Sequence, residues 1–310
     1  MTAAHVVLPS DEARHTPEGD DLWNESYYAD FVQGDGTWGG WLRLGLYPNR
    51  RVAWWTAWIV GPDRQGVCSV DYAVPVPVGT GLVAADAGTR IEIDLRRPLE
   101  EFGLAADAPA QVFAHPEDVY TDEPSSPVRL GVDLTWTTDG TPYHYDLTTR
   151  YEIPCLVTGA VTIDGEVLAV DGQGQRDHSW GVRDWWAFGW CWSSARLDDG
   201  TRVHLADIRM PGFPIAFGYV QGGGAVHPIA TLKMSEDLGP HGFPTSARID
   251  IGAGAGLELG ITVTPLAFGP VLLRNDDGRT SHFPRALVRY QVDDGRAGLG
   301  WIEWNQPDPR

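Results

Sequence analysis

The sequence predicts an all-β protein made of two consecutive antiparallel barrel-like halves. Asp-Gly pairs, which favour the tight turns of β-hairpins, recur at Asp35-Gly36, Asp139-Gly140, Asp164-Gly165, Asp171-Gly172, Asp199-Gly200, Asp277-Gly278 and Asp294-Gly295. Between these pairs polar and apolar residues alternate with period two, as in 202–208 and 289–292, and many are β-branched or aromatic. Helical periodicity is thin. Together these observations favour turn-separated antiparallel strands.

The composition excludes several classes of protein. The 310 residues are 43% hydrophobic and 21% charged, which is typical of a soluble globular chain. No stretch approaches the roughly 18 apolar residues of a membrane helix, so no membrane span is expected. The 42 acidic residues exceed the 23 basic ones and give a formal net charge of -19. Because such a surface repels phosphate backbones, nucleic acid is not expected as a partner.

The cysteines and the N-terminus indicate a compartment. Cys68, Cys155 and Cys191 are odd in number, far apart and in no CxxC spacing, so neither a disulfide framework nor a zinc knuckle is expected. This usage fits a reducing environment. Residues 1–15 contain acids and no long apolar core, which argues against a secretory signal. We therefore place the chain in the cytoplasm.

Strands are expected over most of the chain, with one short helix at 98–102. Pro98 suits a first helical position, and Glu100 and Glu101 suit the first turn of a helix. A compact hairpin is expected at 162–167, and each side of it holds a similar number of strand-like segments. Since domains of about 150 residues are usual, we expect one β domain at 1–165 and a second at 166–310.

Residues 172–192 form the segment richest in chemistry, and five of the 14 tryptophans lie there. If 185–193 is a strand, then Trp186, Phe188, Trp190 and Trp192 share one face, while small residues share the other. The aromatic face supplies bulk. The small face either lets another backbone pack closely or leaves space beside it.

Asp177, His178 and Ser179 are adjacent, but they do not form a catalytic triad. Neighbours on an extended strand point to opposite faces, so His178 lies on one side and the other two on the opposite side. The sequence contains no GxSxG, HExxH or GxxxxGK[ST] motif, which removes the usual serine-hydrolase, zinc-protease and P-loop functions. A metal held by His178, His204 and Asp207 is not expected, because unplaced histidines are more often structural. No cofactor is expected either.

Asp177 is the candidate catalytic acid. In a tryptophan-walled, poorly solvated site the charged form of a carboxyl group is disfavoured, which raises its pKa and keeps it protonated near neutral pH. Aromatic rings around it could stabilise a developing cation by about 2 kcal/mol when desolvated. The alternative is a structural role, in which Asp177 pairs with Arg176, Arg183 or backbone amides.

Weaker candidates lie elsewhere in the chain. His204 is expected on a strand antiparallel to the tryptophan strand, where it could assist Asp177 or position water. Tyr143 follows another turn and is a candidate for substrate binding. Glu303 lies in an aromatic setting near the C-terminal strand and is the second choice of acid or base, with Trp301 beside it as a binding residue.

The run Gly174–Trp185, GQRDHSWGVRDW, resembles the central motif of hydroxyneurosporene synthase-like proteins, also called carotenoid 1,2-hydratase-like. These proteins belong to the two-domain lipocalin-like (calycin) group. Stretches 23–28, 39–45 and 298–303 agree as well, so the likeness spans nearly the whole chain. The resemblance implies two consecutive antiparallel lipocalin-like β-barrels.

In the hydratases, the resemblance further implies acid-catalysed addition of water to an isolated isoprenoid double bond without a cofactor. The motif aspartate, matching Asp177, would be the proton donor. Gln175 stands where the hydratase pattern has a tyrosine. That departure points to another apolar substrate, or to a rearrangement in place of hydration.

These observations predict a cofactor-free enzyme, a hydratase, isomerase or cyclase, whose partner is a small hydrophobic substrate such as a terpenoid, polyene or polyketide. Protonated Asp177 would donate to a carbon-carbon double bond, and the cation would be quenched by water, proton loss or cyclisation. Pocket walls are expected from Trp180, Trp185 and Trp186, and support of the motif from His178 and Arg183.

Two alternatives stay open. A non-catalytic lipocalin-type carrier would use the same aromatic pocket for binding alone. A pericyclase would only fold a polyene for ring closure by proximity. The carrier predicts Asp177 exposed or ion-paired, whereas the acid mechanism predicts it half-buried and facing the cavity.

Overall fold

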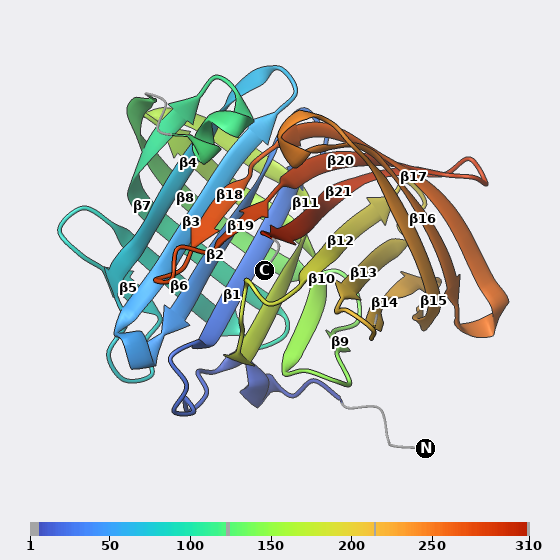
Figure 1. Ribbon diagram of the computed structural model, residues 1–310, viewed down its shortest axis with the longest axis horizontal. Helices are drawn as coiled ribbons and strands as arrows, with labels where there is room; N and C mark the ends of the chain where they lie inside the picture. The colour runs from blue at the N-terminus through green and yellow to red at the C-terminus, as the bar shows by residue number, and fades with distance from the viewer. Residues whose placement is uncertain (1–5, 122–124, 214, 309–310) are drawn as a thin grey trace.

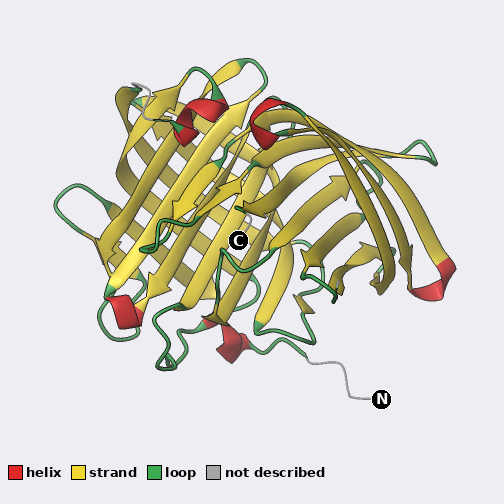
Figure 2. Cartoon of the chain, viewed as in Figure 1, coloured by secondary structure: helices red, strands yellow, loops and turns green. Residues whose placement is uncertain are grey.

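Two antiparallel β-sheets make up the protein (Figure 1). The computed structural model describes residues 6–121, 125–213 and 215–308. Over these ranges strands dominate and the helical segments are 3-10 turns (Figure 2): η1 (Pro9–Glu12), η2 (Pro48–Arg50), η3 (Pro116–Tyr120), η4 (Pro240–Gly242) and η5 (Gly254–Gly256). Within the same residues no helix has the length and apolar character needed to cross a membrane. The all-β prediction is confirmed.

The first sheet closes into a barrel. Its strands are β1 (Trp23–Gln33), β2 (Gly39–Tyr47), β3 (Val52–Gly61), β4 (Arg64–Pro75), β5 (Val83–Ala85), β6 (Arg90–Arg97), β7 (Glu101–Phe113), β8 (Ser126–Thr138), β9 (Tyr143–His144), β10 (Arg150–Ile163) and β11 (Glu166–Val182). Eight of them run in the order β4-β3-β2-β1-β11-β10-β8-β7, and pairing of β4 with β7 closes the ring. Alternate residues of these strands point inward and form one hydrophobic core.

The second sheet closes in the same way. Its strands are β12 (Gly189–Leu197), β13 (Arg202–Arg209), β14 (Ile215–Gly222), β15 (Ala225–Leu238), β16 (Pro244–Ala253), β17 (Leu257–Phe268), β18 (Val271–Arg274), β19 (Thr280–Phe283), β20 (Arg285–Val292) and β21 (Ala297–Pro307). Pairing of β12 with β21 joins the ends of an eight-strand run. The inside holds a separate core. The prediction of two consecutive antiparallel lipocalin-like barrels is therefore confirmed.

A third hydrophobic cluster lies between the two barrels. It joins aromatic residues on the outer face of β2 and β3, such as Trp41 and Trp54, to β12 and β21 of the second sheet. The β18–β19 hairpin extends from β21 and lies over the first barrel, where Leu273 and Phe283 pack into this cluster (Figure 1). The interface between the barrels is therefore a packed layer, and the site described below lies within it.

The Asp-Gly pairs are hairpin turns at five of the seven positions. Asp35, Asp164, Asp199, Asp277 and Asp294 each begin a turn between strands that are consecutive in the chain. The other two pairs differ: 139–140 lies in the loop between β8 and β9, and 171–172 lies inside β11. A Cβ at position 172 would come 2.1 Å from a carbonyl oxygen of β1. The close packing of β11 on β1 therefore requires glycine at position 172. In the sequence, this Asp-Gly pair looks like a turn signal although no turn forms there.

The short helix expected at 98–102 is wrong. Residues 98–100 form the tight turn between β6 and β7, in which the Glu100 amide donates to the Arg97 carbonyl oxygen at 2.8 Å, and residues 101 and 102 begin β7. Leu99 has a φ of 64°, which lies in the left-handed region. Proline at the second turn position has the same preset φ as proline at the start of a helix. Pro98 therefore satisfied either structure.

The chain passes from one sheet to the other between Val182 and Gly189. Residues 165 and 166, between which the domain boundary is expected, lie in the β10–β11 hairpin, whose strands pair over 150–163 and 166–179 within the first sheet. The Asp164-Gly165 pair correctly predicts that hairpin, but it does not indicate which sheet the second strand joins. The division into domains at 165 and 166 stays a prediction.

The tryptophan strand also starts later than expected. Residues 183–188 are a loop, and β12 begins at Gly189, so Trp186 and Phe188 do not share a strand face with Trp190. The side-chain amide of Asn305 on β21 donates to the carbonyl oxygens of Trp185 and Phe188, both at 3.0 Å. These bonds hold the loop against the second sheet.

Candidate active site

The two faces of β11 meet different surroundings, as its period predicts. Gln175 and Asp177 face the second sheet, where Tyr219 of β14 donates to Gln175 Oε1 at 3.0 Å. Arg176 and His178 point into the first barrel. The prediction that Asp177 and His178 lie on opposite sides is confirmed.

A transverse row of side chains crosses the outer face of the first barrel at the level of Asp177. Pairing registers place Tyr28 of β1 opposite Asp177, and Arg43 of β2 opposite Tyr28. On the other side Glu152 of β10 lies opposite Asp177. Because cross-strand partners point to the same face of a sheet, all four polar groups face the second barrel.

A matching row on the second barrel faces it. Glu303 of β21 lies opposite Trp192 of β12 and opposite Arg285 of β20. Between the rows is a small cavity, which we call the interface cavity. It is lined by Ser26, Tyr28, Arg43, Arg150, Asp177, Ser179, Arg183, Trp185, Trp190, Trp192, Arg285 and Glu303.

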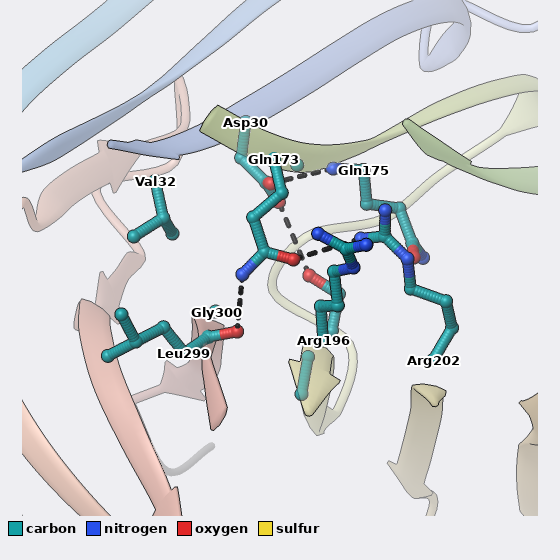
Figure 3. A pocket seen from close by; sticks show the side chains of 11 residues that line it. Asp30, Val32, Gln173, Gln175, Arg196, Arg202, Leu299 and Gly300 are labelled. Carbon is teal, nitrogen blue, oxygen red and sulfur yellow. Dashed lines mark hydrogen bonds between the residues drawn. The ribbon is translucent and has the colours of Figure 1, made fainter. Parts of the chain in front are cut away.

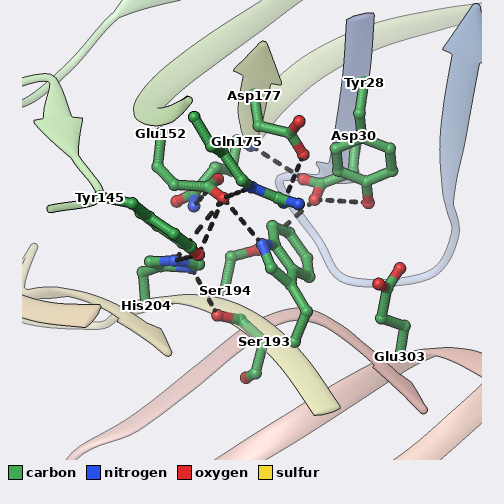
Figure 4. Close-up of polar contacts among 12 residues, drawn as sticks. Tyr28, Asp30, Tyr145, Glu152, Gln175, Asp177, Ser193, Ser194, His204 and Glu303 are labelled. Carbon is green, nitrogen blue, oxygen red and sulfur yellow. Dashed lines mark hydrogen bonds and ion pairs between the residues drawn. The ribbon is translucent and has the colours of Figure 1, made fainter. Parts of the chain in front are cut away.

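Asp177 is buried at this cavity, with 6% of its surface exposed. Arg150 Nη2 donates to Asp177 Oδ2 at 2.7 Å, and Arg150 Nε donates to Glu152 Oε1, also at 2.7 Å (Figure 4). One arginine is thus shared by two carboxyl groups. Burial raises the pKa of Asp177 to about 7 in spite of Arg150, and the charge of Glu152 adds to the rise.

Glu152 is much better supplied with donors than Asp177. Besides Arg150, it accepts from Trp192 Nε1 at 3.0 Å and Gln175 Nε2 at 2.8 Å, and the Tyr145 hydroxyl oxygen lies 3.2 Å from Glu152 Oε1. Burial alone would raise the pKa of Glu152, but Arg150 and these donors hold it below its usual range. Two carboxyl groups whose surroundings separate their pKa values divide into an ionised group and a protonated one. Here Asp177 is the group that takes the proton.

His204 belongs to the same network at a distance from Asp177. Its Nε2 lies 2.6 Å from the Tyr145 hydroxyl and its Nδ1 lies 3.0 Å from the Ser193 carbonyl oxygen (Figure 4). Burial lowers the pKa of His204 to about 4, so the ring is neutral near pH 7. His204 Nε2 lies 3.7 Å from Glu152 Oε1, and Arg150 in turn bridges Glu152 and Asp177. His204 therefore positions Glu152 and does not contact the predicted acid.

Glu303, the second predicted acid, also lines the interface cavity. Trp190 Nε1 donates to Glu303 Oε1 at 2.9 Å, and Arg285 forms an ion pair with the other oxygen. The Arg285 guanidinium lies over the rings of Trp41 and Tyr28, 4.2 Å and 4.5 Å from their centroids. Glu303 therefore has Arg285 as its own ion-pair partner, whereas Asp177 shares Arg150 with Glu152.

Asp30 is a second buried acid of the interface. It accepts from the Tyr28 hydroxyl at 2.9 Å and from the Gln175 amide at 2.8 Å, and burial raises its pKa to about 7. It lines a smaller cleft of about 210 Å³ whose polar groups bind one another, including Gln173 and Arg202 at 3.0 Å (Figure 3). This cleft is a hydrogen-bonded seam between the barrels, whereas the interface cavity combines an acid with aromatic walls.

Two of the predicted binding and support residues line the interface cavity: Trp185 and Arg183. Trp185 Nε1 donates to the Tyr47 hydroxyl at 3.1 Å, and the Arg183 guanidinium lies 5.8 Å from the Trp185 ring centroid. Both side chains come from the loop that joins the two sheets. Arg183 therefore borders the cavity as well as supporting the motif.

Other predicted residues lie away from this cavity. Trp180 is inside the first barrel and stacks on His15 with ring centroids 3.7 Å apart. Trp186 Nε1 donates to the Leu273 carbonyl oxygen at 3.3 Å, Trp301 Nε1 to that of Phe31 at 3.0 Å, and Tyr143 packs on Tyr219 at 5.1 Å. Trp180 was misplaced because it shares the face of His178. The expectation that Trp180 and Trp186 wall the pocket does not fit the interface cavity.

Several site residues were missed from the sequence: Tyr28, Asp30, Arg43, Arg150, Glu152 and Arg285. One signal was present. Ser26, Tyr28 and Asp30 alternate with Tyr27, Ala29 and Phe31 along 26–31, as expected for a strand with a more polar outer face. The register that aligns this face with Asp177 is a tertiary property, and no local pattern contains it.

The described part of the chain brings one set of potential metal ligands together. Ligand atoms of His15, Glu25 and His178 lie within 4.8 Å of one another. Hydrogen bonds already use them: Glu25 Oε1 lies 2.8 Å from His15 Nδ1 and 3.2 Å from His178 Nε2. Arg14 Nε, 4.0 Å from Glu25 Oε2, disfavours an added cation there. His178 and His204 lie on different sides of β11, so they cannot share a metal.

Comparisons with known proteins place the chain in a family. The model of a family described as "domain of unknown function (DUF7064)" matches residues 8–308, and the chain therefore belongs to that family. A search of the curated proteins finds no match to the sequence.

Solved structures share the fold. A candidate AttH protein from Nitrosomonas europaea superposes with a TM-score of 0.65 at 15% identity, covering 98% of both chains. Kievitone hydratase from Nectria haematococca gives 0.63 at 12% identity over 98% of this chain and 94% of its own. CghA gives 0.58 at 11% identity over 96% and 95%. At such low identities the likeness concerns the two-barrel fold.

Proposed function

We propose that this member of the DUF7064 family is a cofactor-free enzyme that protonates a carbon-carbon double bond of a hydrophobic substrate, with Asp177 as the proton donor. Hydration, isomerisation or cyclisation would follow, on a terpenoid, polyene or polyketide. One observation carries the proposal: a buried carboxyl group, with a pKa raised to about 7 by burial, borders a tryptophan-lined cavity between the barrels.

The surroundings of Asp177 suit both halves of a proton transfer. Before the proton transfer, the ionised Glu152 balances the positive charge of Arg150, so the Asp177 carboxyl can stay protonated. After transfer, Arg150 Nη2, 2.7 Å from Asp177 Oδ2, stabilises the new carboxylate. A donor with a pKa near the operating pH is the most effective general acid. Trp185 and Trp192 meanwhile limit the access of water to the reacting carbon.

The comparisons support the class of reaction. A protein with this fold bears the name kievitone hydratase, and another, CghA, has a structure with Sch210972. The GQRDHSWG segment of this chain also resembles the carotenoid 1,2-hydratase-like motif. We therefore extend to this chain a lyase or isomerase activity on an apolar ligand.

We also propose that the enzyme works in the cytoplasm. All three cysteines are free and buried, which is compatible with a reducing compartment. Appearance of the protein in a membrane-free periplasmic or secreted fraction would contradict this location.

The test is incubation with a panel of hydrophobic alkenes and polyenes in heavy water, with mass spectrometry of the products. Wild-type product is expected to carry deuterium at the protonated carbon. Asp177→Asn keeps the shape but has no acidic proton, so turnover should fall on the order of a hundredfold or more while folding is retained. Glu303→Gln is the matched control and should lose much less.

The carrier is the second candidate, because Asp177 is ion-paired with Arg150. A carrier would bind the same ligands with no turnover in either protein. A pericyclase would give turnover without deuterium and only a modest loss in Asp177→Asn. If the folded fraction of Asp177→Asn is fully active, the acid is another group, and Glu303 becomes the first choice.

A further inference from the structure

The interface cavity is strongly basic, although the chain as a whole carries a net charge of -19. Four guanidinium groups line it, those of Arg43, Arg150, Arg183 and Arg285, against the two carboxyl groups of Asp177 and Glu303. At least two positive charges therefore exceed the negative charges of the lining. When Asp177 is protonated the excess grows by one.

The excess is located on Arg43 and Arg183. Arg150 is bound by Asp177 and Glu152, and Arg285 by Glu303. Among the described residues, by contrast, neither Arg43 nor Arg183 has a carboxylate within 4.0 Å. Arg43 Nη2 has a weak contact with Asn24 Oδ1 at 3.4 Å.

Both unpaired guanidinium groups lie on the ring of Trp185. Their Cζ atoms are 4.9 Å (Arg43) and 5.8 Å (Arg183) from its centroid. Burial, with repulsion from Arg150 and Arg43, lowers the pKa of Arg183 to about 10. Arg43 and Arg183 are half-buried, whereas Arg285 is 6% exposed, and its Nε and Nη1 have no hydrogen-bond partner among the described residues. Buried cationic donors such as these two of Arg285 are costly unless an anion binds them.

An apolar compartment adjoins this basic region. It is a small space that shares Arg43, Trp185 and Arg285 with the interface cavity. Its remaining walls lie between the first barrel and the β18–β19 hairpin, and include Trp54, Tyr72, Val271, Leu273 and Phe283. A ligand that reaches both spaces would meet guanidinium groups at one end and aromatic and aliphatic side chains at the other.

We propose that the site recognises an acidic amphipathic substrate, whose carboxylate or ionised enol binds Arg43 and Arg183 and whose apolar body fills the adjoining compartment. This proposal rests on the proposed function, because it concerns the substrate of the same site. It also restricts the chemistry. A full carbocation beside unpaired guanidinium groups is unfavourable, so the anionic group of the substrate offsets that repulsion where Asp177 protonates the double bond.

The test uses two probes of equal length, decanoate and decan-1-ol, with tryptophan fluorescence as the readout because Trp185, Trp190 and Trp192 line the cavity. Wild-type protein is expected to bind decanoate at least tenfold more tightly than decan-1-ol. Arg43→Gln and Arg183→Gln should each lower decanoate affinity about tenfold and leave decan-1-ol affinity unchanged. Arg289→Gln, an exposed arginine of β20, is the matched control and should change neither.

Equal affinity for the two probes, no binding of decanoate, or equal loss of both probes in the arginine variants would overturn the proposal. Circular dichroism and thermal melts of each variant separate loss of binding from loss of fold. Asp177→Asn should retain decanoate binding. If it does, and no substrate is turned over by wild-type protein, the proposed reaction fails while the acidic-ligand site stands. Deuterium-labelled product with no preference for acidic ligands would show the reverse.

Discussion

Two arginine-carboxylate pairs lie on opposite faces of β11, and the pair on the outer face borders the interface cavity. Inside the first barrel, Arg176 Nη1 donates to Glu12 Oε1 at 2.5 Å, and the Tyr151 hydroxyl donates to the same oxygen at 2.9 Å. On the outer face, Arg150 binds Asp177 beside the interface cavity. In the first pair Arg176 binds the carboxyl group of Glu12. In the second pair Arg150 is shared by the carboxyl groups of Asp177 and Glu152.

The adjacent residues Arg176 and Asp177 therefore differ in how their buried charges are compensated. Arg176 binds η1 of the N-terminal segment to the first barrel, and neither Arg176 nor Glu12 lines the interface cavity. Asp177 has less support for its negative charge, because Glu152 competes for Arg150. Burial raises the pKa of Asp177 to about 7, and Arg150, which Glu152 shares, offsets that rise only in part.

The largest effect is expected from a substitution that breaks the Arg176–Glu12 pair. Arg176→Gln leaves Glu12 buried without its counter-ion, which should cost about 3 to 5 kcal/mol of the free energy of unfolding. Urea denaturation followed by circular dichroism measures this loss. Arg97→Gln, which removes an exposed arginine that pairs with Glu101, should cost at most about 1 kcal/mol. Similar losses in the two variants would contradict the structural role of Arg176.

The next effect concerns stability and pH at the shared pair. Folded Asp177 keeps its proton up to about pH 7, whereas an unfolded aspartate loses it near 3.8. The folded state binds more protons across this window, so the free energy of unfolding should fall as pH rises from about 4 to about 7, by up to about 1.4 kcal/mol per unit. Asp30, with a pKa also near 7, acts in the same direction.

Asp177→Asn removes one of these two contributions, so its free energy of unfolding should fall less steeply over the same window. Urea denaturation at a series of pH values compares the two proteins. A variant whose stability follows the wild-type curve would mean that Asp177 is ionised throughout.

A smaller effect distinguishes tryptophans on the two faces. Trp185 borders both spaces, so Trp185→Phe should lower decanoate affinity about tenfold through lost contact area. Trp180→Phe changes a ring that stacks on His15 inside the barrel and should leave affinity unchanged. Fluorescence titrations of both variants give the comparison. Loss of affinity in Trp180→Phe alone would place the ligand inside the first barrel.

The smallest effect is expected from metal removal. Glu25 is hydrogen-bonded to both His15 and His178 and approached by Arg14, so dialysis against a chelator should leave the melting temperature and any turnover unchanged. Metal analysis of the purified protein complements the melts. Stoichiometric zinc or iron that survives dialysis, together with a lower melting temperature after its removal, would assign these three residues as ligands.

Local patterns in the sequence were enough to predict much of the fold. Asp-Gly pairs and period-two alternation gave antiparallel strands, and period two also separated Asp177 from His178. The same local rules failed where two structures share one signal. Pro98 suits a helix start and a tight turn, and glycine at 172 suits a turn and a close strand contact.

The site was predicted only in part, for a physical reason. Asp177, Arg183, Trp185 and Glu303 were named, and they do line one cavity. Arg43 and the other missing members come from strands that are distant in the chain, and pairing register alone brings them together. Shifting the register of a strand by one residue would turn these groups to the opposite face.

The central claim is that Asp177 holds a proton near neutral pH at the cavity, and infrared spectroscopy can observe that proton. The difference spectrum between wild-type protein and Asp177→Asn isolates the carboxyl absorption of this residue, which is followed from about pH 5 to about pH 9. A protonated-carboxyl band that disappears with a midpoint near pH 7 is the expected result. A carboxylate band already complete at the acid end of the titration would contradict the account, because Asp177 would then be the ionised partner of Arg150 and no proton donor.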